Sequence, residues 1–346
     1  MSTISAPPGA GARSIALPEP RGPLTERLFA TLLGRDRAPL DLLEASASTD
    51  PLRDEDLQLA LYVCYELHYS GIDGVDERWE WSPSLLALRG RLEAQFEQAL
   101  DALVGPCAPD DLLDVGAALQ RLVAEDDGPP LSRFAETRAS AEQMLEHVIH
   151  RSAYQLKEAD PHSWAIPRLT GAPKAALLEI QFDEYGEGRV ERMHASLFAR
   201  TMAGLGLDPS YGAYIGLLPA ITLATVNLMS GFGLHRRRRG ALVGHLAAFE
   251  MTSSIPNRRH ANAFRRLGHG AEVTGFYDEH VEADAVHENI AAWDLAGGLA
   301  QAEPQLAADI FFGARALLAL EALWAGHLLG AWHDGRSSLF APLPVS

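Results

Sequence analysis

The chain has few cysteines, fewer basic than acidic residues, and almost no long apolar runs. Only two of its 346 residues are cysteine, which excludes a secreted fold held by a disulfide framework and suits a reducing cytoplasm. The sequence has 29 basic and 46 acidic residues, for a formal net charge of −17. Nucleic-acid binding needs a basic face that replaces the counterions of the phosphates, so this balance argues against a nucleic-acid partner. We therefore expect a cytoplasmic protein.

A targeting signal and a membrane span are also missing. Residues 1–23 hold five prolines and three glycines but no apolar run, which is typical of a disordered tail and not of a signal peptide. Residues 210–234 carry no charge and are followed by four arginines, so their length alone permits a span. Four glycines and Pro219 interrupt this segment. It therefore predicts a buried core helix, broken near Pro219, and no membrane association.

Alternating strands with hairpin turns are absent, and apolar residues recur at the three- and four-residue spacings of helices. We expect helices at 56–69, 82–104, 112–125, 132–158, 174–205, 217–232, 234–251, 271–295 and 303–332. Three prolines and a glycine predict a loop at 159–173. A break at 126–130 divides an N-terminal helical region, 24–130, from a bundle at 131–340, although the two could share one core. The fold class is all-α.

One segment combines two histidines and a carboxylate at helical spacing. In HVEADAVH, offsets of four and three residues place His280, Asp284 and His287 on one face of a helix. Two imidazoles and a carboxylate on one stripe form a ligand set for a first-row metal. A solvated acidic helix face has the same composition, so this segment alone leaves both interpretations open.

Other carboxylates and a histidine occur on or next to three further expected helices. They are Glu158, Glu184, Glu187, Glu191, His194 and Glu250. Glu191 precedes His194 by three residues, as in a Glu-x-x-His motif. Glu250 follows a largely apolar stretch, where an unpaired carboxylate would be costly. Taken in order, these residues follow the pattern of a di-iron helical bundle.

These residues resemble those of the heme-oxygenase-like di-iron oxidases and oxygenases, which are described as iron-containing redox enzymes. The core helix of that family carries His-x-x-x-Asp-x-x-His, matched by His280, Asp284 and His287. A glutamate about thirty residues earlier corresponds to Glu250, and a histidine about 56 residues before that corresponds to His194. The segments QFDEYGEGRVERMH, GHLAAFEMTSS and YDEHVEADAVHE look like the family, and the likeness covers most of residues 140–335.

The remaining two carboxylates of the family fall on Glu158 and Glu184. Some members place the second of them seven residues before the histidine, which would choose Glu187. A ferritin-like arrangement would choose Glu191 and leave His280 outside the site. The flanking Asp-Glu-Tyr-Gly favours Glu184, and all three alternatives imply two metal ions.

The resemblance implies a heme-oxygenase-like bundle with an N-terminal helical extension, holding two iron ions with O2 as co-substrate. O2 would be reduced to a peroxo-bridged di-iron(III) species that attacks a C–H bond or an amine nitrogen of a small metabolite, amino-acid-like or fatty-acid-like. One iron would be held by His194, Glu158 and His287, and the other by His280, Asp284 and Glu184, with Glu250 as the bridge. Mn(II) would satisfy the same ligands. An external electron donor and a homodimer are compatible with this interpretation.

Three other functions remain as alternatives. A heme protein of the same fold would need one axial imidazole and not a carboxylate-rich cluster. A heme-oxygenase-fold binding or accessory protein without redox catalysis would give a purpose to the N-terminal extension of about 130 residues. A metal-storage protein would favour a shell-like assembly, which no feature of the sequence indicates.

Overall fold

The computed structural model describes residues 15–36, 39–40, 48–106, 108 and 112–343, except for the side chains of 282–286. Within these residues the chain consists of helices and connecting loops, and the one β-type pairing is an isolated bridge between Ile15 and Ile72. The all-α fold expected from the sequence is therefore confirmed.

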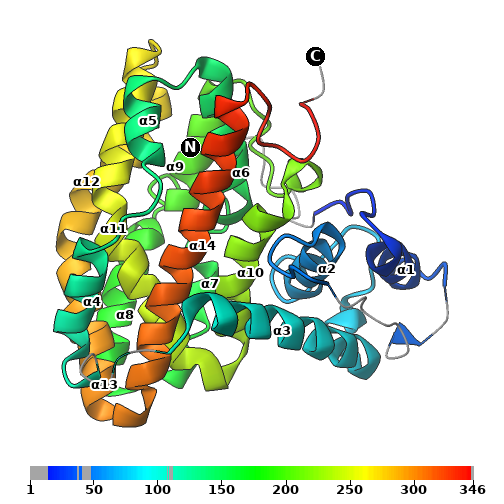
Figure 1. Ribbon diagram of the computed structural model, residues 1–346, viewed down its shortest axis with the longest axis horizontal. Coiled ribbons are helices and arrows are strands. Elements are labelled where there is room, and N and C mark those ends of the chain that lie inside the picture. The colour runs from blue at the N-terminus through cyan, green and yellow to red at the C-terminus, as the bar shows by residue number, and fades with distance from the viewer. Residues whose placement is uncertain (1–14, 37–38, 41–47, 107, 109–111, 344–346) are drawn as a thin grey trace, which may run out of the picture.

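The helices form a long bundle with a smaller lobe at one side (Figure 1). The lobe contains α1 (Pro23–Leu32), α2 (Glu55–Glu66) and α3 (Pro83–Val104). The bundle contains α4 (Val115–Ala124), α5 (Leu131–Thr137), α6 (Ala141–Gln155), α7 (Asp160–Ser163), α8 (Gly171–Glu184), α9 (His194–Gly204), α10 (Ala220–Leu234), α11 (Arg239–Arg266), α12 (Ala271–Asn289), α13 (Gly298–Ala302) and α14 (Ala307–His333). A π-helix, Ile290–Gly297, joins α12 to α13. Short 3-10 turns lie at Glu77–Trp81, Ile166–Arg168, Gly186–Gly188, Ile215–Leu217, Arg236–Arg238 and Pro304–Leu306.

Two of the expected helices are each divided in the structure. The helix expected at 132–158 is split into α5 and α6 because Ser140 starts a new helix with a capping box, in which its side chain and that of Gln143 bond each other's backbone N–H. The helix expected at 174–205 is split into α8 and α9 at Gly186, where φ is 63°. An added Cβ at Gly186 would lie 2.4 Å from the backbone nitrogen of Met193, so this tight turn requires glycine.

The charge-free segment forms a core helix as expected. Pro219 is the N-cap of α10, which is buried along most of its length. No helix in the described part of the chain is long and apolar enough to cross a membrane. In contrast, the helix expected to end at residue 251 continues through Pro256 as α11 and ends at Arg266. Its last turns pack against α5 and α12, and this packing outweighs the cost of an internal proline.

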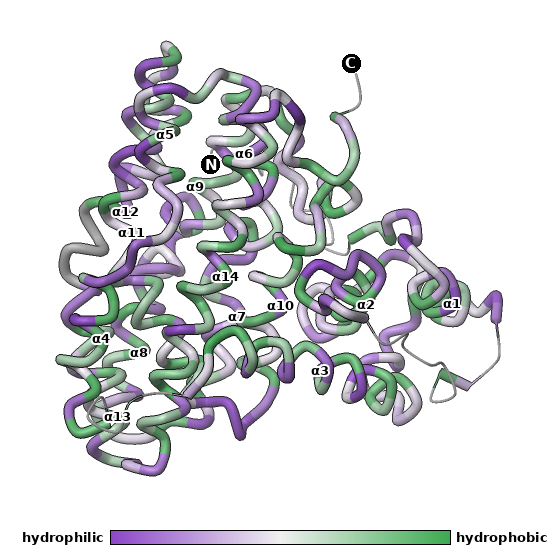
Figure 2. The backbone as a smooth tube through the Cα atoms, viewed as in Figure 1, coloured by the Kyte–Doolittle hydropathy of each residue, from purple (hydrophilic) through white to green (hydrophobic). Residues whose placement is uncertain are grey.

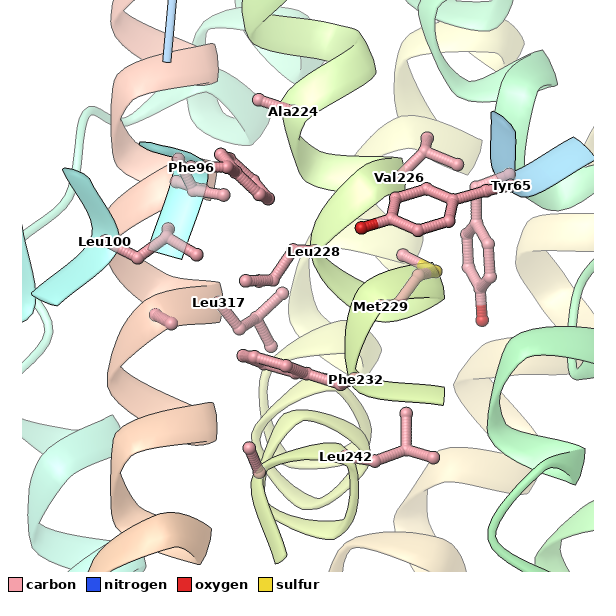
Figure 3. Packing of buried hydrophobic residues seen from close by; sticks show 14 of the residues in the cluster. Tyr65, Phe96, Leu100, Ala224, Val226, Leu228, Met229, Phe232, Leu242 and Leu317 are labelled. Atoms are coloured by element: carbon pink, nitrogen blue, oxygen red, sulfur yellow. The ribbon is translucent and has the colours of Figure 1, made fainter. Parts of the chain in front are cut away.

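One hydrophobic core runs through both the lobe and the bundle. Phe96 and Leu100 of α3 pack near Leu228 of α10 and Leu317 of α14, and Tyr65 of α2 lies beside Val226 and Met229 of α10 (Figure 3). Hydrophobic residues follow α10 and α14 along much of their lengths (Figure 2). The N-terminal helices therefore cover apolar surface that the bundle alone would leave exposed to water.

The structure describes part of the segment before α1. Residues 1–14 of the expected disordered tail lie outside the described residues. From Ile15 onward the chain is packed: Ile15 is buried, and its backbone bonds Gly71 and Asp73. Arg21 forms an ion pair with Glu55 at 2.6 Å. The last nine residues of the expected tail are thus part of the fold.

Candidate metal centre

Six of the seven residues expected as metal ligands come together inside the bundle. They are Glu158, Glu184, His194, Glu250, His280 and His287, with exposed fractions between 1% and 7%. They come from the turn between α6 and α7 and from α8, α9, α11 and α12. The seventh, Asp284, lies in α12, but its side chain is outside the described residues.

The loop between α8 and α9 brings Glu184 and His194 together. Glu184 is the last residue of α8 and His194 the first of α9, and the turn at Gly186 reverses the chain between them. His194 Nδ1 lies 2.9 Å from Glu184 Oε2. Burial raises the pKa of Glu184, but the positive charge of His194 outweighs this and lowers the pKa to about 2.

His280 of α12 lies beside this pair. Its Nδ1 donates a hydrogen bond to the Phe276 carbonyl at 2.8 Å, so Nε2 is the nitrogen that faces Glu158 Oε1, 3.5 Å away. The rings of His280 and His194 lie 4.4 Å apart between centroids. The backbone bond at Nδ1 thus fixes which ring nitrogen is available to a metal.

His287 lies between two carboxylates. Its Nε2 is 2.8 Å from Asp183 Oδ2, and its Nδ1 is 3.4 Å from Glu250 Oε2. Burial lowers the pKa of His287, but the contacts with Glu250 and then Asp183 outweigh this and raise it to about 9. Sequence reasoning missed Asp183; the available signal was its position next to Glu184 at the end of one helix.

The candidate ligands form two groups with one shared member. The first group is Glu158, Glu184, His194 and His280, and the second is Glu184, Glu250 and His287; within each, the ligand atoms lie within 4.8 Å of one another. This grouping differs from the expected one, in which Glu250 was the bridge and His287 was placed with His194. The difference arises from how α9 packs along α12. His194 of α9 lies next to His280 and Phe276 of α12, and His287 lies two turns further along α12.

Of the three alternative glutamates, only Glu184 belongs to the cluster. Glu187 has a left-handed backbone conformation, with φ at 54°, and forms an ion pair with Arg192 at 2.8 Å. Glu191 is exposed to solvent. Glu187 lies in the short 3-10 turn after α8 and Glu191 lies beyond it, and neither belongs to the buried ligand groups.

The donor atoms suit a metal ion. Glu158 Oε2, His194 Nδ1 and His287 Nδ1 are buried, and none of them has a hydrogen bond of acceptable geometry. Leaving a buried polar atom without a partner costs about 1–3 kcal/mol. Carboxylate oxygens and imidazole nitrogens are ligands of iron and manganese, so these residues fit a first-row metal site.

A small cavity adjoins the two groups. Its lining consists of Glu158, Glu184, Glu250 and His280 together with residues that include Tyr154, His162, Gln181 and Phe249. The space that the centre of a water molecule can occupy in this cavity is about 10 Å³. This is room for one water or for a diatomic molecule next to the candidate ligands.

A known protein family matches part of the chain. The family described as "Iron-containing redox enzyme" matches residues 145–322, just over half of the chain. All seven expected ligands, Asp284 included, lie within that segment. No curated protein matches the chain in sequence.

Proposed function

The chain belongs to the family of iron-containing redox enzymes, and from that premise we propose that it is a non-heme di-iron oxidase or oxygenase acting on a small metabolite. The observation that carries this proposal is the pair of buried ligand groups that share Glu184. A single heme would be served by one axial imidazole, whereas three histidines with three carboxylates suit two metal ions.

The residues would divide between the two ions as their contacts do. Glu158, His194 and His280 would hold one iron, and Glu250 and His287 the other, with Glu184 within reach of both. Asp284 remains a candidate ligand on the helix that carries both α12 histidines. Manganese would fit the same donor atoms, and the family description favours iron.

Two bound iron ions would supply the electrons that turn O2 into an oxidant able to attack a C–H bond or an amine nitrogen. The protein would fix the ligands and exclude water. The Phe276 carbonyl orients His280, and Asp183 orients His287. Phe249 and Leu246 line the small cavity and restrict the entry of bulk water.

The substrate class follows from the family resemblance, which covers amino-acid-like and fatty-acid-like metabolites. A cavity with room for one water next to the ligands would have to widen before either could enter. An external electron donor would return the irons to the reduced state between turnovers.

Anaerobic loading with Fe(II), followed by mixing with O2, tests this proposal. We expect about two irons per chain and a transient visible absorption after mixing. A Soret band after incubation with heme, together with no retained iron, would favour the heme-binding alternative. One iron with no response to O2 would overturn the di-iron proposal.

A further inference from the structure

A buried ion pair joins the N-terminal region to the residue next to a candidate ligand. Lys157 precedes Glu158, and its Nζ lies 3.0 Å from Oε2 of Glu66, the last residue of α2. The exposed fractions are 4% for Lys157 and 0% for Glu66. Tyr211 Oη donates a second hydrogen bond to the same Glu66 oxygen, at 2.7 Å.

Three tyrosine rings surround the Lys157 ammonium group. Measured to the ring centroids, Nζ lies 4.2 Å from Tyr69, 5.1 Å from Tyr62 and 5.7 Å from Tyr211. Withdrawing two opposite charges from water costs several kcal/mol per ion before their attraction repays it. A hydrophobic pair of the same size would fill this space at a lower desolvation cost. A functional role therefore explains the Lys157–Glu66 ion pair better than a contribution to stability does.

Contacts with other helices stabilise the turn that carries Glu158. α6 ends at Gln155, so Glu158 is not the last residue of a helix, as the sequence suggested, but lies in the turn that follows. Ala159 has a φ of 74°, a left-handed conformation that costs a non-glycine residue about 1–2 kcal/mol. On one side of Glu158, the Ala159 carbonyl accepts a hydrogen bond from Gln181 at 3.0 Å. On the other side, Lys157 is held by Glu66.

We propose that Glu66, acting through Lys157, is a positioning residue of the metal centre: it fixes the turn that presents Glu158 to the metal. This inference rests on the proposed function, and it extends the metal centre to a residue outside the segment 145–322 that matches the family. It also assigns a functional role to the N-terminal region, because the last residue of α2 then orients a metal ligand.

Removing the charge of Lys157 distinguishes a positioning role from a purely electrostatic effect on the metal. A nearby positive charge repels a metal cation, so removing it by Lys157→Met would strengthen metal binding if charge alone mattered. If Lys157 positions Glu158, the same substitution weakens binding. Glu66→Gln weakens binding under both accounts, so Lys157→Met is the decisive variant.

Anaerobic titration of the full-length apoprotein with Co(II), followed by visible absorption, tests the inference without turnover. We expect E66Q and K157M to bind one Co(II) about 10–100-fold more weakly than the unsubstituted protein and to show an altered d–d spectrum. Y211F keeps both charges and removes the hydrogen bonds of Tyr211 Oη with Glu66 and Tyr62, so we expect a smaller loss of about threefold to tenfold. Y211F also provides the test if K157M does not fold.

E55Q is the matched control. Glu55 lies at the other end of α2, about 16 Å along the helix, where it pairs with Arg21 and bonds the Ala220 amide at 2.9 Å. E55Q thus weakens the same interface away from Glu158, and we expect a lower Tm with unchanged Co(II) affinity. Tm values of all variants report the general loss of stability.

Three results would overturn the inference while two Co(II) ions still bind to the unsubstituted chain. They are unchanged affinity in E66Q and K157M, tighter binding in K157M, and an equal loss in E55Q. Failure of the unsubstituted chain to bind two ions would overturn the proposed function, and the inference with it.

Discussion

At the scale of single residues, the centre depends on pairs in which one side chain or carbonyl fixes the orientation of another. The Phe276 carbonyl holds His280 Nδ1, and Asp183 holds His287 Nε2. In both cases the opposite ring nitrogen faces a buried carboxylate. Partners of this kind set the tautomer and orientation of a metal-binding imidazole, and their loss weakens metal sites.

Asp183→Asn should weaken the iron bound by Glu250 and His287 by about 10–100-fold, because the amide no longer attracts the imidazole N–H as a carboxylate does. Anaerobic Fe(II) titration measures this loss. Glu179→Gln removes an exposed charge from the same helix and should leave iron binding unchanged. Equal affinities for the two variants would contradict a role for Asp183.

Glu184→Gln should reduce iron binding more than any other single substitution of a glutamate, because Glu184 is the member common to both groups. We expect fewer than one iron per chain by metal analysis, with the fold retained because glutamine has the same shape. Glu187→Gln breaks only the ion pairs with Arg192 and Arg189 and should retain two irons per chain. Loss of iron in the Glu187 variant alone would show that the wrong glutamate has been assigned.

At the scale of elements, helical spacing predicted which residues share a face but not how the helices meet. The stripe of His280 and His287 could be read from the sequence because both lie on one continuous helix, α12. The partners of each histidine could not, because they depend on the level at which α9 and α11 pack along α12. The turn that holds Glu158 was also missed, since it depends on contacts with Gln181 and Glu66 from distant helices.

The α8–α9 turn gives a prediction at this scale. Gly186→Ala should destabilise the fold and lower metal affinity, because φ is 63° and the new Cβ would meet the Met193 backbone. We expect a loss of about 1–3 kcal/mol in the free energy of unfolding, from urea titration. Gly188→Ala has a similar φ of 78° but no atom within 4 Å, so it should lose only about 1 kcal/mol and keep its metal affinity. Equal losses of affinity would contradict the role assigned to the turn.

At the scale of the whole molecule, the lobe and the bundle share one core and the candidate ligands lie within the bundle. The sequence predicted an N-terminal helical region but could not indicate that α2 and α3 cover α10 and α14. Hydrophobic contacts are non-directional, so an apolar residue does not specify which residues it packs against. The bundle also buries several histidines that are not among the candidate ligands. Among them, His162 and His245 lie 3.1 Å apart between ring nitrogens.

These buried histidines predict the acid sensitivity of the apoprotein. Burial lowers the pKa of His162 to about 4 and that of His260 to about 3. Below about pH 6.5 the unfolded chain takes up protons that the folded chain does not, so stability falls with pH. Between pH 6.5 and 5 each histidine should cost about 2 kcal/mol, measured by urea unfolding at the two values.

Two of the candidate ligands, His287 and Glu184, should not contribute to this loss of stability between pH 6.5 and 5. The raised pKa of His287, about 9, adds stability that is fully present below pH 6.5 and is lost as pH rises through 9. The lowered pKa of Glu184, about 2, adds stability that is lost only as pH falls below about 4.5. Constant stability from pH 6.5 to 5 would contradict the burial of neutral histidines.

The most direct test of the di-iron centre is a crystal structure of the Fe(II)-loaded protein with anomalous diffraction at the iron edge. We predict two anomalous peaks per chain, one beside Glu158, His194 and His280 and one beside Glu250 and His287, with Glu184 in contact with both. A single peak, no peak, or two irons that Glu184 does not contact would contradict the account.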